Sequence, residues 1–167
     1  YRTQYGLEDA NAVLAANGKP ALVYFDAANT DCYQVDQAGA WSAAAAKEYM
    51  DTNFVSYNEA NGNMIELVIC NNDGMAEGVI ASLQEKGYNV AGAHVVPVFG
   101  VDATDNAKAL IADGAMTGTV KQDADGMAAA IAQTAKAINE GKTAVDALAA
   151  LSDSRFSIAG DSKAKLF

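Results

Sequence analysis

Basic residues are scarce in this chain of 167 residues. It has 11 lysines and arginines against 21 aspartates and glutamates, which gives a formal net charge of −10. A nucleic-acid surface needs lysine and arginine clustered on one face, whereas the few present here are scattered along the chain. The composition therefore argues against a nucleic-acid partner, and the acidity mainly favours solubility.

Histidine, cysteine and long apolar runs are also scarce. The single histidine, His94, precedes an apolar segment and is expected to be an ordinary loop residue. No apolar stretch approaches the roughly 20 residues of a membrane span. Cys32 and Cys70 lack the spacing of metal ligands. We interpret both as small buried hydrophobic residues, with a disulfide as the alternative.

Apolar segments alternate with helix-like segments over most of the chain. Runs rich in β-branched and aromatic residues predict buried strands at 20–27, 64–70, 95–103, 118–123 and 155–160. Helical spacing or propensity, with glycine at several ends, predicts helices at 1–17, 40–50, 73–86, 106–114, 126–141 and 143–151. This order predicts an α/β fold: a parallel sheet with helices on both faces.

Polar residues follow three of the predicted strands where each one ends. They are residues 71–73, Asp102 and residues 121–123. Ligands of open parallel sheets bind beyond the carboxyl ends of the strands, so we expect these groups at one edge of the sheet. Asp73 is expected to cap the following helix, which would leave an asparagine free to face a cleft.

The residue types at this edge suit a ligand rich in hydroxyl groups. Carboxylate and amide side chains pair with hydroxyls, Trp41 offers a flat apolar face, and Arg2 offers a fork of donors. No nucleophile–base pair is apparent, which argues against catalysis. The alternatives are that residues 71–73 and Asp102 only cap helices, and that Trp41 is an ordinary aromatic residue.

Four segments together resemble the periplasmic galactose/glucose-binding protein family, the solute-binding components of ABC sugar transporters. They are "RTQY", "IELVICNNDGMAEGVIASL", "VPVFGVDA" and "GAMTGTVKQDADG". The resemblance implies a periplasmic-binding-protein-like (type I) lobe. It also implies that the chain is only the carboxyl-terminal half of a two-lobed protein, incomplete at its N-terminal side. The chain opens at Tyr1 without a methionine or signal peptide, so we expect a processed or truncated product.

The resemblance also implies a role for individual residues. Arg2 matches an arginine that hydrogen-bonds the sugar, and Trp41 matches a tryptophan that stacks on its ring. Asn72 and Asp102 match residues that bind ring hydroxyls. Gln122 stands where galactose binders have asparagine and ribose binders have glutamine. The resemblance therefore does not determine which sugar is bound.

A calcium site is the further feature that the resemblance brings. Glu66, inside an apolar strand, either faces outward or binds a ligand, and it matches a glutamate that completes a calcium site in the family. The calcium loop itself would lie upstream of Tyr1. We therefore expect no cofactor in this chain and calcium only in the full-length parent, because one glutamate cannot supply six to eight oxygens.

The domain organisation follows from the same comparison. Residues 1–120 would form most of the carboxyl-terminal sugar-binding lobe, 121–155 would cross to the amino-terminal lobe, and 156–167 would return. A strand between those at 20–27 and 64–70 would precede Tyr1. The exposed strand edges, and an apolar stripe on the helix at 125–140, predict that the isolated chain self-associates or rearranges its sheet.

The expected function is a non-enzymatic receptor outside the cell. It would close around a glucose- or galactose-type hexose and deliver it to ABC permease membrane subunits, with a chemoreceptor as a further candidate partner. The expected location is the periplasm, or an extracellular lipoprotein anchored to the membrane. The alternatives are the effector-binding domain of a lactose-repressor-type regulator and, third, an enzyme on the same scaffold.

Overall fold

The chain divides into two compact units, residues 1–122 and 123–167. The structure is a computed structural model that describes residues 2–152, 157–158 and 164–165. In the sequence, the boundary between the two units falls after Gln122, two residues beyond the end of the third strand of the first unit.

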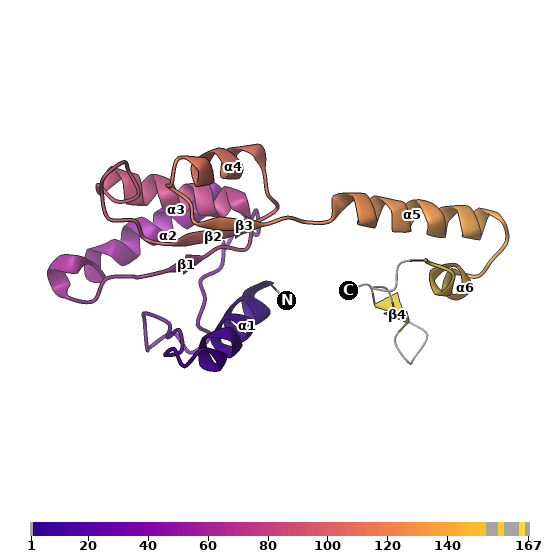
Figure 1. Ribbon diagram of the computed structural model, residues 1–167, viewed down its shortest axis with the longest axis horizontal. Coiled ribbons are helices and arrows are strands. Elements are labelled where there is room, and N and C mark those ends of the chain that lie inside the picture. Colours follow the sequence, from indigo (N-terminus) through magenta and orange to yellow (C-terminus); the bar gives the residue numbers. More distant parts are fainter. Residues whose placement is uncertain (1, 153–156, 159–163, 166–167) are drawn as a thin grey trace. The chain divides into compact units, whose positions relative to one another are not determined.

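A three-stranded parallel sheet forms the centre of the first unit (Figure 1). Its strands β1 (Val68–Ile69), β2 (Val98–Val101) and β3 (Gly118–Val120) lie in the order β1-β2-β3. Helix α3 (Asp73–Glu85) connects β1 to β2, and α4 (Asp105–Ala112) connects β2 to β3. Right-handed crossovers in one direction place both helices on the same face of the sheet.

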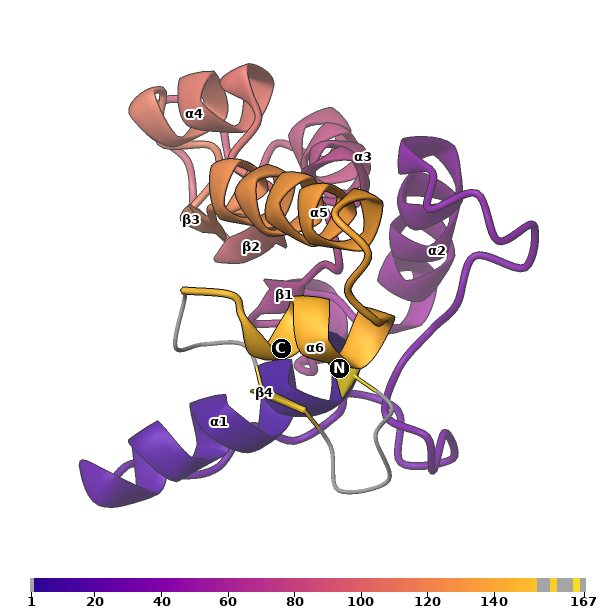
Figure 2. The ribbon, with the colours of Figure 1, turned by 90° about the vertical axis from the view of Figure 1, so that its right-hand side faces the viewer.

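Helix α2 (Ala43–Ser56) packs against α3, and helix α1 (Arg2–Ala16) lies on the other side of the sheet (Figures 1 and 2). A short 3₁₀ turn, η1 (Glu59–Asn61), follows α2. Helices therefore flank both faces, and the predicted fold class is confirmed. The face toward α1 is covered less completely, because Ile69 and Phe99 remain 44% and 37% exposed.

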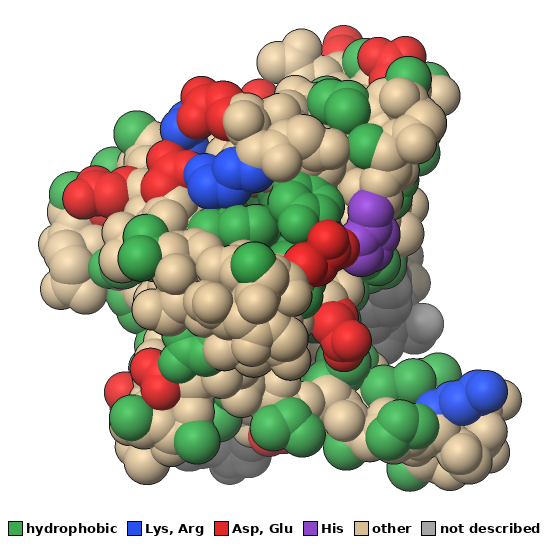
Figure 3. Space-filling model, turned by 90° about the vertical axis from the view of Figure 1, so that its left-hand side faces the viewer, with side chains coloured by type: hydrophobic (Ala, Val, Ile, Leu, Met, Phe, Trp, Pro, Cys, Tyr) green, Lys and Arg blue, Asp and Glu red, His purple; other side chains and the backbone are tan. Residues whose placement is uncertain are grey.

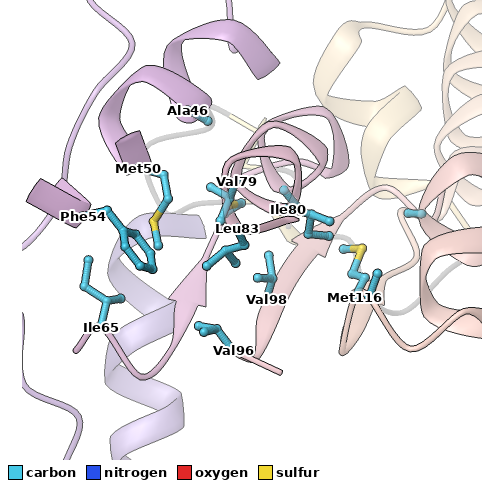
Figure 4. Packing of buried hydrophobic residues seen from close by; sticks show 14 residues of the cluster. Ala46, Met50, Phe54, Ile65, Val79, Ile80, Leu83, Val96, Val98 and Met116 are labelled. Atoms are coloured by element: carbon cyan, nitrogen blue, oxygen red, sulfur yellow. The ribbon is translucent and has the colours of Figure 1, made fainter. Parts of the chain in front are cut away.

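The hydrophobic core lies between the sheet and helices α2 and α3 (Figure 4). Met50 and Phe54 come from α2, Ile80 and Leu83 from α3, and Val98 from β2. Leu83 and Val98 are fully buried. Burying one side chain of this size stabilises the fold by roughly 1.5–3 kcal/mol. This layer therefore fixes where the ends of β1 and β2 lie.

The predicted strand at residues 20–27 is wrong. This segment is irregular and Val23 is 88% exposed, although Phe25 packs against the core. A short apolar run becomes a strand only when a neighbouring strand pairs with it. Within the described residues no strand occupies the free side of β1, so the segment has no pairing partner there.

The other predicted elements of the first unit are confirmed with changed bounds: the strands are shorter, and helix α2 extends six residues beyond its predicted end at Met50. The strand predicted at 64–70 is reduced to the two residues of β1, because regular pairing with β2 covers only that length. The two cysteines are free and differ in environment. Cys70 is buried as predicted, whereas Cys32 is exposed, so its predicted burial and the alternative disulfide are both wrong.

The second unit contains helices α5 (Ala124–Asn139) and α6 (Ala144–Ala149), which pack on each other. Strands β4 (Ser157–Ile158) and β5 (Ala164–Lys165) pair antiparallel. Within the predicted strand at 155–160, only residues 157–158 are described. Most of the predicted returning segment, 156–167, lies outside the described residues.

No helix in the described part of the chain has the length and apolar character that crossing a bilayer requires.

Candidate functional site

The carboxyl ends of β1, β2 and β3 bring the predicted polar residues to one edge. Val68 pairs with Val98 in β2, and Val101 pairs with Val120 in β3, so the three strands end side by side. Beyond β1 the chain enters the Asn71–Asn72 turn, and beyond β2 it reaches Asp102. The sheet edge predicted from the sequence is therefore present.

Arg2 links these two turns across the edge. Its Nη1 donates a hydrogen bond to the carbonyl oxygen of Asn71 at 2.5 Å, and its Nη2 lies 3.3 Å from Asp102 Oδ1. About one third of each charged side chain is exposed, so the ion pair contributes only about 0–1 kcal/mol. A ligand bearing hydroxyl groups can replace this contact at little cost.

Asn72 joins the start of α3 to the loop that carries Trp41. Its Oδ1 accepts from the Met75 backbone N–H at 2.7 Å, and its Nδ2 donates to the Trp41 carbonyl oxygen at 3.2 Å. Asn72 is thus the N-cap of α3, and the prediction that Asp73 fills this position is wrong. The amide nitrogen carries a second proton that is available to a ligand.

Trp41 sits in a left-handed backbone conformation, with φ of 55°, and is 53% exposed. The Asp36 carboxylate holds its loop by accepting hydrogen bonds from the backbone N–H groups of Ser42 at 3.0 Å and Ala38 at 2.9 Å. These bonds favour the ionised carboxylate and lower the pKa of Asp36. The loop therefore holds an exposed Trp41 whose backbone carbonyl contacts Asn72.

The side chain of Asp73 is buried in the structure and does not cap α3. Its carboxylate is fully buried, and it accepts from the Thr119 hydroxyl at 2.6 Å and the Thr104 backbone N–H at 2.8 Å. Thr104, and not Asp102, caps α4, so Asp102 is not engaged as a helix cap. The signal that could have found this role is Gly100, whose missing side chain leaves room for the carboxylate.

The remaining predicted residues lie apart from these contacts. Gln122 is exposed, two residues beyond the end of β3, and its role stays a prediction. Glu66 is exposed on the segment before β1. Among the described residues no three acidic, histidine or cysteine side chains are grouped to hold a metal ion. Glu66 by itself does not make a calcium site, so the calcium prediction concerns only a longer parent.

A separate shallow hollow of about 400 Å³ lies at the opposite end of α3 from Asn72 (Figure 3). Phe54 and Tyr88 form its apolar wall, and Asp51 and Lys86 lie at its rim. These two charges are already paired with each other. Because α3 has 13 residues and is about 20 Å long, the hollow cannot share a small ligand with the strand-end site.

The sequence of this chain is similar to that of known periplasmic binding proteins. Residues 4–143 match the family described as periplasmic binding protein domain. The D-galactose/methyl-galactoside binding periplasmic protein MglB of Haemophilus influenzae is 33% identical over 145 residues. This match covers 87% of the present chain and 37% of that protein.

A solved structure shows the same fold. It is an ABC transporter solute binding protein from Burkholderia multivorans, with an unknown ligand built as alpha-D-erythrofuranose. The two are 23% identical with a TM-score of 0.50, over 62% of this chain and 34% of the other. The present chain thus spans just over a third of the length of each of these relatives.

Proposed function

This chain belongs to the periplasmic binding protein domain family, and we propose that it is part of a receptor that binds a monosaccharide and delivers it to a membrane transporter. The observation that carries the proposal is the cluster at the strand ends, where Arg2 contacts Asp102 and the Asn71 carbonyl, and the neighbouring Asn72 contacts the backbone of the exposed Trp41. Its residues bind and orient, and we propose no catalytic step.

The geometry supports a sugar in a specific way. The guanidinium of Arg2 and the Nδ2 group of Asn72 supply donors, and the carboxylate of Asp102 accepts hydroxyl protons. The indole of Trp41 offers an apolar face of the kind that the C–H face of a sugar ring covers. The arrangement thus matches the alternation of polar edge and apolar face in a pyranose.

A glucose- or galactose-type hexose is the proposed ligand. It is favoured by the 33% identity to a protein named for D-galactose and methyl-galactoside binding. Gln122 is proposed as an additional contact. The proposed partners are the membrane subunits of an ABC permease and, second, a chemoreceptor. The proposed location is the periplasm or the outer face of the membrane as a lipoprotein.

We also propose that the isolated chain self-associates. In the second unit, Met127, Ile131 and Ile138 lie on α5 and are 42%, 69% and 47% exposed. Such an apolar stripe favours association. Light scattering should show oligomers for the wild-type chain and fewer for Ile131→Lys, while Gln133→Lys serves as the control on the same helix. Monodisperse wild-type monomers would contradict this.

Calorimetry on the longer protein that contains this chain tests the function. We expect glucose or galactose to bind more tightly than ribose or arabinose. Asp102→Ala should weaken binding about 10- to 100-fold, because it leaves sugar hydroxyls unpaired in the closed site. Asp105→Ala removes an exposed carboxylate at the start of α4 and is the matched control.

Two results would decide against the proposal. Absence of binding by any of the four sugars at millimolar concentration would exclude the sugar receptor. A DNA-binding head encoded before Tyr1 would instead favour the lactose-repressor-type regulator, in which a bound sugar would act as an effector. A signal or lipoprotein leader there would favour transport.

A further inference from the structure

The turn that carries Asp102 has an unusual backbone conformation. The φ angles of Asp102 and Ala103 are 120° and 57°, and both lie in the region that disfavours residues with a side chain. Two consecutive strained residues persist only when their surroundings fix them. This turn sits at the strand-end site, so what fixes it also fixes the Asp102 carboxylate.

Three successive backbone N–H groups hold the turn. That of Asp102 donates to the Val120 carbonyl oxygen at 2.9 Å, which extends the pairing of β2 with β3. That of Ala103 donates to the Thr119 Oγ1 atom at 3.2 Å. That of Thr104 donates to the Asp73 Oδ2 atom at 2.8 Å. Every residue of the turn is therefore anchored by its own acceptor.

Two of these acceptors are linked to each other. The Thr119 hydroxyl donates to Asp73 Oδ1 at 2.6 Å while it accepts from Ala103. Asp73 is fully buried, and both of its carboxylate oxygens are used in these bonds. The carboxylate therefore orients the hydroxyl, and the hydroxyl orients the turn.

We propose that Asp73 and Thr119 are positioning residues that hold Asp102 in the conformation needed to bind a ligand. This inference rests on the proposed function, in which the Asp102 carboxylate accepts sugar hydroxyls. Neither Asp73 nor Thr119 is assigned a contact with the sugar. Their effect on binding passes through the backbone of the turn.

The chain contains a matched control for a purely structural role. Thr117, two residues before Thr119, accepts a hydrogen bond on its hydroxyl from the Val98 backbone N–H at 3.2 Å. This bond also joins β3 to β2, but at the other end of the strands, away from Asp102. Thr117→Val removes this one bond, whereas Thr119→Val removes both the bond from Ala103 and the bond to Asp73, and only Thr119→Val affects the turn.

The test measures amide hydrogen exchange by NMR and sugar binding on the same samples of the 167-residue chain. In Thr119→Val we expect the Ala103 amide to exchange at least about tenfold faster and the dissociation constant for D-galactose or D-glucose to rise about tenfold. Thr119→Ser keeps the hydroxyl and should restore both values. Thr117→Val should change neither of them.

Two outcomes would overturn the inference. One is unchanged Ala103 exchange in Thr119→Val, and the other is equal weakening of sugar binding by Thr117→Val. If the wild-type chain and the longer protein bind no sugar, the proposed function fails separately. In that case the exchange of the Ala103 amide is the remaining test. Faster exchange in Thr119→Val but not in Thr117→Val supports the anchoring of the turn, and unchanged exchange in Thr119→Val refutes it.

Discussion

Replacing Gly100 with alanine should disrupt the link between the core and the strand-end site. A Cβ atom at this position of β2 would overlap Asp73 Oδ1 and lie 2.8 Å from Met116 Cε and 3.2 Å from Asp73 Cα. The last contact involves the backbone of α3, which cannot move without shifting the helix. The Asp73 carboxylate would have to leave its hydrogen bonds or α3 would have to move from the sheet.

The expected loss of stability follows from these distances. Overpacking of this kind costs about 1–3 kcal/mol, and alanine recovers only about 0.4–1 kcal/mol by restricting the unfolded chain. We expect the free energy of unfolding to fall by about 1–2 kcal/mol. Gly118→Ala is the control on β3, because its Cβ would meet only the Phe99 ring, at 3.4 and 3.5 Å.

Urea denaturation followed by circular dichroism measures the difference between the two variants. Gly100→Ala should unfold at a clearly lower urea concentration than the wild type, and Gly118→Ala should remain within about 0.5 kcal/mol of it. Equal midpoints for Gly100→Ala and Gly118→Ala would refute the close packing of Asp73 against β2.

Two further predictions concern ionisation. Hydrogen bonds from Lys47, Lys86 and Ser82 hold the pKa of Asp51 well below 3.8, so its stabilisation is fully present above that pH and is lost as pH falls through the lowered pKa. Asp51→Asn should therefore lower the free energy of unfolding by up to about 1 kcal/mol at neutral pH and by progressively less below pH 3.8. Urea titrations at several pH values measure this difference, and a difference that does not change with pH would contradict the prediction. Burial raises the pKa of Cys70 to about 12, so a thiol reagent should label exposed Cys32 quickly and Cys70 only on unfolding.

Local sequence signals predicted the helices well. Helix α1 ends at Ala16, shortly before Gly18, and α4 is followed by Gly114, where left-handed φ angles of 65° and 75° end each helix. The parallel order of β1, β2 and β3 followed from the alternation of apolar runs with helices. These features depend on neighbours in sequence, which the sequence displays directly.

The errors arose where distant residues decide the structure. Residues 20–27 have the composition of a strand but no pairing partner among the described residues. Three consecutive polar residues follow β1, and only the space left by Gly100 determines that Asp73 turns inward while Asn72 caps α3. The role of Thr119 likewise depends on a turn from another strand.

An NMR titration of the ¹⁵N-labelled chain with D-galactose and D-glucose tests the central claim most directly. The sugar should shift the Asn72 side-chain amide, the Trp41 indole N–H and the Asp102 backbone amide together, with one common dissociation constant. These shifts are expected even if affinity is weak in a chain that spans about a third of its relatives' length. Absence of shifts at these groups, or shifts confined to the hollow at Phe54 and Tyr88, would contradict a sugar site at the strand ends.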